Sequence, residues 1–242
     1  MSFESFGNGG ATMKPRVPVI TVDGPSGVGK GMVTRWLAQK THWHRLDSGA
    51  LYRILALAAV HQKIPLDESA RVAALAADLK IVFSGETEAD EAIHVNGENW
   101  TAEVRVETSG ELASQIATSP LVRAALLQRQ RDFRTAPGLI ADGRDMGTVV
   151  FTDADLKIFL DASAEARAER RWRQLSAKGT GVKLADLFAE VRLRDTRDRK
   201  RLIAPLAAAP DAVVVDTTQM EPVEVLDVVK ALLQKRGLLG GQ

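Results

Sequence analysis

Short apolar runs alternate along the chain with longer segments of helical periodicity. The clearest run, Val17 to Val22, is rich in β-branched residues and ends just before an Asp-Gly pair. Each further run is bounded by Asp or Gly, as buried parallel strands are. These runs are Leu139 to Ala141, Leu156 to Leu160 and Ala212 to Val215. We expect all of them to be strands of one parallel sheet.

Helical patterns separate these strands. Residues 29–40 place Val33, Trp36 and Leu37 on one face of a helix. Similar patterns cover residues 121–133, 164–177, 184–194 and 222–235. Strands that alternate with helices of this length are typical of βαβ units. The predicted fold class is therefore α/β, a three-layer core with helices on both faces of a parallel sheet.

One stretch breaks the alternation. Leu79 to Ser84 and Ala92 to Val95 are predicted strands, and Asn96-Gly97 predicts a tight hairpin that leads into residues 99–106. We expect a small antiparallel sheet here, inserted between helices near residues 51–60 and 108–118. It should be a subdomain of the main domain and not a second domain.

Composition excludes several classes of protein. The 242 residues are 45% hydrophobic and 26% charged, and 32 Lys and Arg balance 31 Asp and Glu. This balance excludes a broadly basic nucleic-acid coat, and the absence of cysteine excludes disulfides and thiolate chemistry. The longest apolar run, residues 54–60, is far shorter than the roughly 20 residues of a membrane span. We expect a soluble, cytoplasmic protein whose first 14 residues form a flexible leader.

Charge is unevenly distributed. Residues 86–111 carry eight acids and one base, whereas residues 167–201 carry twelve bases and five acids. Each run is either a solvated helix face or, for the basic one, part of a phosphate site. RNA binding by the basic run is a weaker alternative, because Trp172 and Phe188 are its only aromatic residues.

A phosphate-binding loop follows the first strand. The segment Gly24 to Lys30 matches GxxxxGK between a predicted strand and a predicted helix, which is the context that this motif requires. Glycines let backbone N–H groups converge on an anion, and the helix N-terminus adds its positive dipole end. The predicted ATP contacts are Gly24, Pro25, Ser26, Gly27, Val28, Gly29, Lys30, Gly31 and Met32.

The loop departs from the strict pattern after its lysine. Gly31 and Met32 stand where a hydroxyl residue would help to hold Mg²⁺, and Thr34 lies about 200° further around the helix than Met32. We therefore expect Mg²⁺ to be held by nucleotide phosphates and water, with no direct protein ligand.

Other features narrow the class of nucleotide-binding protein. No Asn-Lys pair for guanine recognition is present, and a candidate strand ends in Asp142-Gly143 instead of the Asp-Glu of motor ATPases. Arginine is abundant at positions 53, 123 and 144 and within 167–173 and 192–201. Its planar fork pairs with phosphate oxygens, so transfer onto a second phosphorylated substrate is favoured.

Four motifs in order resemble those of bacterial cytidylate kinases, within the nucleoside monophosphate kinase group of P-loop proteins. They are GPSGVGKG at 24–31, DSGALYR at 47–53, DGRDMGTVVF at 142–151 and RDTRDRKR at 194–201. The resemblance runs from about residue 17 to about 235. It implies phosphoryl transfer from MgATP to CMP or dCMP, and a monomer with no nucleic-acid or membrane partner. It also implies one kinase domain at 15–236, with a monophosphate-binding insert at 61–118 and a lid at 163–182.

The same resemblance assigns residues to roles. The catalytic residues are Lys30, Arg144 and Asp142, and the lid arginines are Arg167, Arg170 and Arg171. The CMP-binding residues are Ser48, Arg53, Ser114, Arg123, Asp145, Arg194, Asp198 and Arg201. Ser114, Arg123 and Asp145 would read cytosine, Arg194 and Asp198 the ribose, and Arg201 the acceptor phosphate.

Structural alternatives remain open for many of these residues. Ser48 is also placed to cap a helix and Asp142 to stabilise a turn. Ser114 could be an ordinary serine on a helix face, and Arg123 an exposed helix arginine. Residues 194, 198 and 201 share a face only if their helix continues, and they could instead form a surface stripe. Two alternatives remain for the whole chain, a kinase of other base preference such as UMP, or a regulatory module without turnover.

Overall fold

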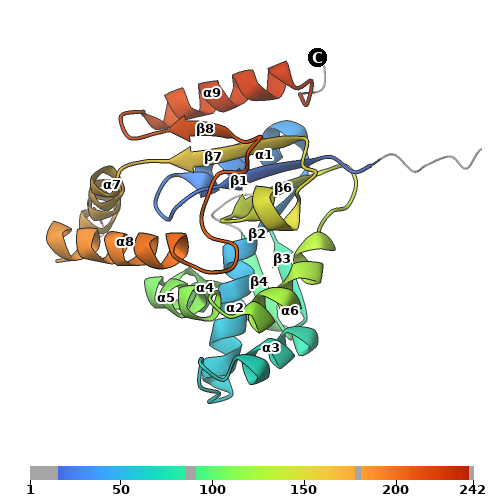
Figure 1. Cartoon of the computed structure of the whole chain (residues 1–242), viewed down its shortest axis with the longest axis vertical. Helices are drawn as coiled ribbons and strands as arrows, with labels where there is room; N and C mark the ends of the chain where they lie inside the picture. Colours follow the sequence, from blue (N-terminus) through green and yellow to red (C-terminus); the bar gives the residue numbers. More distant parts are fainter. Residues whose placement is uncertain (1–15, 86–90, 178–180, 240–242) are drawn as a thin grey trace, which may run out of the picture.

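The computed structural model describes residues 16–85, 91–177 and 181–239, so the expected leader lies outside the described residues. Its centre is a parallel sheet of order β2-β6-β1-β7-β8 (Figure 1). The strands are β1 (Val19–Asp23), β2 (His44–Asp47), β6 (Leu139–Gly143), β7 (Leu156–Asp161) and β8 (Val213–Asp216). The predicted parallel sheet is thereby confirmed, with β2 as an edge strand that the apolar pattern did not indicate.

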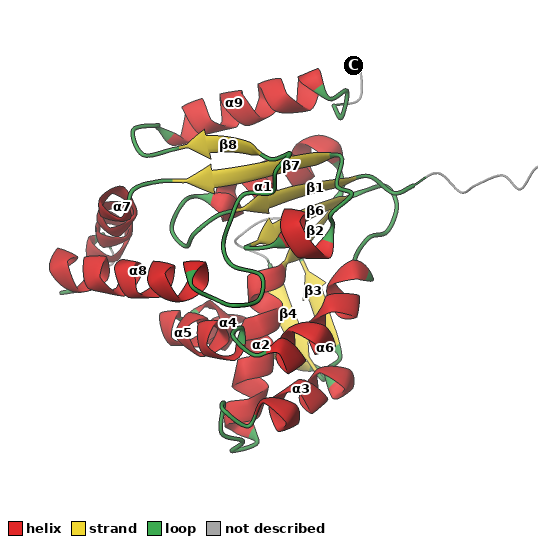
Figure 2. Ribbon diagram, in the orientation of Figure 1, coloured by secondary structure: helices red, strands yellow, loops and turns green. Residues whose placement is uncertain are grey.

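Helices cover both faces of this sheet, and others belong to a separate group that includes α3, α4 and α5 (Figure 2). They are α1 (Lys30–Thr41), α2 (Ser48–His61), α3 (Ser69–Asp78), α4 (Thr101–Arg105), α5 (Glu107–Ile116), α6 (Pro120–Arg131), the π-helical turn η1 (Met146–Val150), α7 (Ala164–Ser176), α8 (Leu184–Arg199) and α9 (Pro222–Lys235). In the described part of the chain, no helix is long and apolar enough to span a bilayer.

The two faces of the sheet bury different clusters. On one face, Ile20 and Val22 of β1 pack with residues of α1 and α9, including Leu37 and Val229. On the other, Val19 packs with residues of β2, α2 and η1, and side chains from α6 add to this cluster. Alternate side chains of β1 therefore serve opposite layers, which confirms a three-layer α/β core.

The inserted sheet comprises β3 (Ile81–Ser84), β4 (Ala92–Val95) and β5 (Glu98–Asn99). Asn96 and Gly97 both have positive φ and join β4 to β5, as the hairpin signal predicted. The expectation of a longer third strand at 99–106 was wrong, because Thr101 begins the helix α4. Trp100 is buried there in the apolar cluster of the insert, which also holds Val104.

The strands of the parallel sheet all end at one edge. In Figure 1 the arrowheads point toward α7 and α8, which lie beyond that edge, while α2 to α6 and the small sheet form a separate group beside α8. The loop after β1 and the segment after β6 also emerge there, because these strands run in parallel register. Ligands of open parallel sheets bind outside this edge, at the carboxyl ends of the strands.

Candidate active site

The loop after β1 is shaped by glycines at positions that other residues cannot fill. Gly24 has φ +147°, and a side-chain Cβ there would lie 2.1 Å from the carbonyl oxygen of Leu160 on β7. Gly29, at φ +97°, immediately precedes α1, so the free N–H groups of the first helical turn begin at Lys30. This is the backbone geometry of an anion site at a helix N-terminus.

Lys30 is buried within this loop. Its Nζ donates a hydrogen bond to the carbonyl oxygen of Pro25 at 2.7 Å. Burial, reinforced by the positive charge of Arg144, lowers the pKa of Lys30 to about 7. Asp142, at the end of β6, is buried nearby, and burial raises its pKa to about 6 against the opposing effect of Lys30. A polyphosphate in the loop would supply the negative charge that favours a protonated Lys30.

Asp23 is a site residue that sequence reasoning missed. Its carboxylate accepts hydrogen bonds from the backbone N–H groups of Met146 and Gly147, each at 2.8 Å. Burial raises the pKa of Asp23 to about 7, although these hydrogen bonds oppose the change. Its position directly before the loop was the only available signal. Asp23 ties the phosphate loop to the Arg144-bearing segment after β6.

Arginines gather where β6 meets α8. Arg144 Nε lies 3.1 Å from Asp198 Oδ2, and Arg201 Nη2 lies 3.9 Å from the other oxygen of Asp198. Among the described residues, the buried Arg194 Nε and Arg201 Nη2 have no hydrogen-bond acceptor. Burial and the charge of Arg144 lower the pKa of Arg194 to about 10. These buried donors fit a bound anion, because a buried N–H without a partner is costly.

Residues 194, 198 and 201 could share one face of α8 only if this helix continued to residue 201. It stops at Arg199, so Arg201 lies beyond the helix, where its Nε donates to the carbonyl oxygen of Asp198 at 3.2 Å. The surface-stripe alternative was also wrong, because the side chains of Asp198 and Arg201 are buried. The residues converge on one site by a turn of the chain after the helix.

The predicted residues Ser114, Arg123 and Asp145 lie on α5, on α6 and just after β6. Arg123 is buried and ion-paired with Asp145, and its guanidinium carbon lies 5.9 Å from the centre of the Tyr52 ring. Ser114 is also buried, with its Oγ 3.5 Å from Asp198 Oδ1. The alternative of an exposed helix arginine was therefore wrong for Arg123. Arg123 and Asp145 together present hydrogen-bond donors and acceptors beside Tyr52.

Ser48 and Arg53 lie on α2. Asp47, not Ser48, caps this helix by accepting a hydrogen bond from the N–H of Ala50, so the capping alternative for Ser48 was wrong. Ser48 instead donates to Gln130 Oε1 at 2.8 Å. Arg53 donates to the carbonyl oxygen of Val104 at 2.9 Å. A Cβ on Gly110 would lie 3.2 Å from Arg53 and 3.4 Å from Arg194, so both guanidiniums lie against α5 at this glycine.

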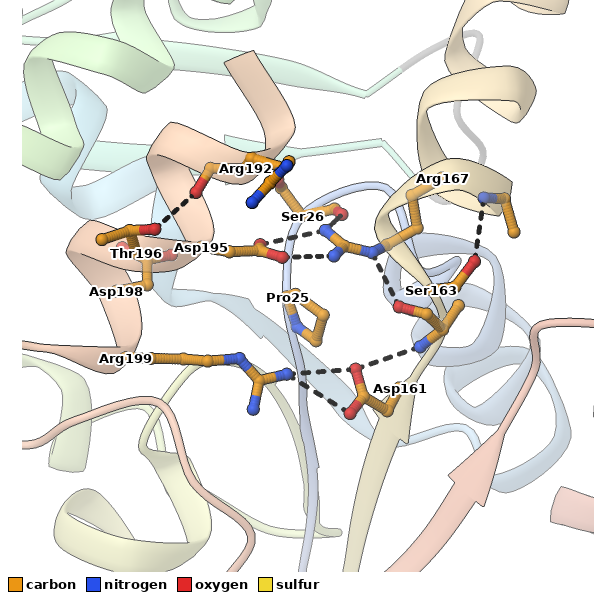
Figure 3. Close-up of polar contacts among 12 residues, drawn as sticks. Pro25, Ser26, Asp161, Ser163, Arg167, Arg192, Asp195, Thr196, Asp198 and Arg199 are labelled. Carbon is orange, nitrogen blue, oxygen red and sulfur yellow. Dashed lines mark hydrogen bonds and ion pairs between the residues drawn. The ribbon is translucent and has the colours of Figure 1, made fainter. Parts of the chain in front are cut away.

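The predicted lid arginines start from α7 and make different contacts. Arg167 is buried against the phosphate loop and pairs with Asp195 of α8 (Figure 3). Arg170 bonds to the backbone near β8, including the carbonyl oxygen of Thr217. Arg171 Nη2 lies 2.5 Å from Glu107 Oε2 of α5. Arg167 therefore does not lie on a solvated helix face, which was one alternative for the basic run. Residues 178–180 of the predicted lid lie outside the described residues.

The described residues contain no group of His, Cys, Asp or Glu side chains that could enclose a metal ion. Met32 packs against the apolar cluster that also contains residues of α9. The Thr34 hydroxyl is turned to its own helix, where it donates to the carbonyl oxygen of Gly31 at 3.3 Å. Neither side chain offers an oxygen to an ion on the loop.

The chain is similar to known proteins over most of its length. The model of the cytidylate kinase family matches residues 20–235. A cytidylate kinase from Aeromonas salmonicida (strain A449) is 54% identical over 224 residues, which cover 93% of this chain and 97% of the relative. The chain belongs to the cytidylate kinase family. A second cytidylate kinase, from Proteus mirabilis (strain HI4320), is 53% identical over 90% of this chain and 97% of its own.

Solved structures align less closely. A gluconokinase from Sinorhizobium meliloti 1021 matches with a TM-score of 0.43 and 16% identity over 92% of this chain and 94% of that one. A likeness of this size carries no argument about the site. The assignment to the cytidylate kinase family rests on the family model and the sequence relatives.

Proposed function

We propose that this member of the cytidylate kinase family transfers a phosphoryl group from MgATP to CMP or dCMP, giving ADP and CDP or dCDP. One observation supports the proposal most strongly. Buried guanidinium nitrogens of Arg194 and Arg201 lack acceptors at the same sheet edge as the phosphate loop. Two anion-binding regions at one edge fit a donor triphosphate and an acceptor monophosphate that approach each other.

The donor side consists of the loop from Gly24 to Met32. Its backbone N–H groups would hold the phosphates, and Lys30 would move from the Pro25 carbonyl to the transferring phosphate oxygens. Mg²⁺ would arrive as MgATP, bound by phosphate oxygens and water. Asp142 would accept a hydrogen bond from a water of that ion, and its carboxylate would balance the charge of the nearby Lys30.

The acceptor side is built from the insert and α8. Ser114, Arg123 and Asp145 would recognise cytosine, because an arginine and a carboxylate complement its N3, O2 and N4 groups. Arg194 and Asp198 would hold the ribose. Ser48, Arg53 and Arg201 would hold the acceptor phosphate.

No strong general base is required, because the attacking phosphate oxygen is already negative. Catalysis then consists of aligning the attacking oxygen in line with the bond that breaks and of stabilising charge on the transferring group. Arg144 pairs with Asp198 of the acceptor cluster at 3.1 Å, and its positive charge also lowers the pKa of Lys30 in the loop. It is the residue best placed to stabilise the transferring phosphoryl group.

Water must be kept from the transferring group, because it would otherwise accept the phosphoryl. Arg170 and Arg171 on α7 would serve this closure, and the contact of Arg171 with Glu107 already joins α7 to the insert. A monomer in the cytoplasm is part of the proposal. Light scattering of the purified chain and fractionation of the cells that make it would test those two points.

The test of the reaction is a coupled ADP-release assay with MgATP and separate CMP, dCMP, UMP, AMP and GMP. Rapid turnover confined to CMP and dCMP is expected. Equal or faster turnover with UMP would replace the proposal with a kinase of other base preference. ATP binding without turnover on any monophosphate would support the regulatory module instead.

A further inference from the structure

Arg167 is held by the protein on every side of its guanidinium. The residue is only 2% exposed. Its Nε donates to the carbonyl oxygen of Ala162 at 3.0 Å, and its Nη1 donates to the carbonyl oxygen of Ser26 at 3.1 Å. Nη1 and Nη2 also bind the two carboxylate oxygens of Asp195, which Figure 3 shows extending from α8. The guanidinium thus joins α8 to the phosphate loop.

The contact with Ser26 fixes one peptide of that loop. In a trans peptide the C=O and the next N–H point in opposite directions, so a Ser26 carbonyl held by Arg167 turns the Gly27 N–H away from Arg167. The stem of Arg167 also packs beside this peptide, because a Cβ on Gly27 would lie 3.5 Å from the Arg167 Cβ. Gly27 itself has φ +75°, in the left-handed region that glycine adopts without steric cost.

Asp195 in turn fixes Arg167. A pairing of both carboxylate oxygens with both terminal nitrogens sets the plane of the guanidinium as well as its position. It also compensates a positive charge that would otherwise be buried unpaired. Asp195 stands between Arg194 and Asp198 in sequence, yet its side chain serves the donor loop and not the acceptor cluster.

We propose that Asp195 and Arg167 are positioning residues for the donor-phosphate loop. Asp195 fixes Arg167, and Arg167 fixes the Ser26–Gly27 peptide, so that the loop N–H groups are set before ATP arrives. The inference rests on the proposed use of this loop to hold ATP. It gives Arg167 a different role from a lid arginine that swings onto the nucleotide.

The test compares Asp195→Asn and Arg167→Lys with the control Arg199→Gln. Arg199 is the last residue of α8, and it pairs with Asp161 at 3.3 Å, so it also joins α8 to the sheet but at the end of β7 (Figure 3). We expect kcat/KM for ATP to fall roughly 10- to 100-fold in both test variants. KM for CMP should stay within about twofold, and the double variant should be no worse than the poorer single one, because the two residues act as a unit. The control should match the unmodified enzyme.

Two kinetic outcomes would overturn the proposal. If Arg167 instead touches ATP directly, Asp195→Asn would release it and leave kcat/KM for ATP unchanged or higher, while Arg167→Lys would lower it. If KM for CMP rises as much as that for ATP, the substitutions disturb α8 as a whole.

A second measurement does not depend on turnover. Hydrogen exchange of the ligand-free Arg167→Lys protein should be faster than that of the unmodified chain at residues 24–30 and unchanged at Val213–Asp216 of β8. Equal exchange at residues 24–30, or faster exchange throughout, would contradict a positioning role. A chain without CMP turnover would refute the proposed function, whereas the exchange comparison would still decide the role of Arg167.

Discussion

Arg144 Nε lies 3.1 Å from Asp198 Oδ2, and this ion pair joins the end of β6 to α8 in the centre of the site. Burial by itself would raise the pKa of Asp198. Arg144, Arg201 and Arg194 outweigh that effect and lower the pKa of Asp198 below its ordinary value. One buried carboxylate therefore holds several guanidiniums together before any substrate binds.

This relationship predicts that Asp198→Asn destabilises the ligand-free protein. The free energy of unfolding should fall by roughly 3 kcal/mol at neutral pH, because the buried guanidiniums lose their counter-charge. The folded-state pKa of Asp198 is lowered, so its charge contributes to the free energy of unfolding at pH values above its ordinary pKa of 3.8. This contribution is lost as the pH falls through the folded-state pKa. Urea unfolding at several pH values measures both effects.

The matched control for that experiment is Asp161→Asn, which breaks the more exposed pair with Arg199. Its cost should be below about 1 kcal/mol. If Asp198→Asn costs no more than the control, the arginines do not depend on Asp198 for compensation. A higher KM for CMP is also expected of Asp198→Asn and not of Asp161→Asn.

Lys30 and Ser114 are predicted to act on different kinetic constants. Lys30→Ala should lower kcat by roughly 10²- to 10³-fold, because its charge is needed most as the phosphoryl group transfers. Ser114→Ala removes one neutral hydrogen bond, so KM for CMP should rise about 3- to 10-fold with little change in kcat. Steady-state kinetics with both substrates varied separates the two cases. Comparable losses of kcat in both variants would refute this division.

ATP affinity should depend on pH through Lys30. Burial and Arg144 lower the pKa of Lys30 to about 7 in the free protein, whereas a bound polyphosphate favours the protonated form. Above pH 7, binding must therefore be accompanied by proton uptake, and affinity should fall by up to about tenfold per pH unit. The ligand does not itself titrate there, because the second pKa of a phosphate is about 6.

Calorimetric titration with a non-hydrolysable ATP analogue between pH 6.5 and 9 would measure that dependence. The variant Lys30→Met should bind more weakly at low pH and show a shallower profile, which keeps only the titration of the neighbouring Asp23 and Asp142, whose pKa values are about 7 and about 6. A flat profile in the unmodified protein would mean that Lys30 is already fully charged before ATP binds.

The order of strands and helices was largely predictable because the strands that carry the site are buried on both faces. Such strands are continuous apolar runs, as in Leu156–Asp161. The edge strand His44–Asp47 has only one buried residue, Leu46, so no apolar run marked it. Residues 101–105 were misassigned because the apolar and polar residues after the hairpin fit either a strand or a short helix.

The location of the candidate site was predictable from motifs, whereas its pairings were not. The GxxxxGK pattern indicated the loop. No local sequence pattern indicates that Arg167 donates a hydrogen bond to the carbonyl oxygen of Ser26, a residue 141 positions earlier. The pairing of Arg144 with Asp198 likewise spans 54 positions. Such contacts depend on how α7 and α8 cross the sheet edge, which is a property of the whole fold.

The two residues that follow Lys30, Gly31 and Met32, have no hydroxyl that could bind Mg²⁺. Met32 packs toward the apolar cluster between the sheet and α9, and Thr34 bonds to its own helix, so neither presents an oxygen to the loop. If Mg²⁺ is held by phosphates and water, Met32→Thr should leave kcat and the Mg²⁺ requirement within about twofold of their original values. The matched control is Met32→Ala, which removes the same apolar contact without adding a hydroxyl. A Met32→Thr enzyme that is faster, or saturates at lower Mg²⁺ than both the control and the unmodified chain, would show that the ion uses a protein hydroxyl when one is offered.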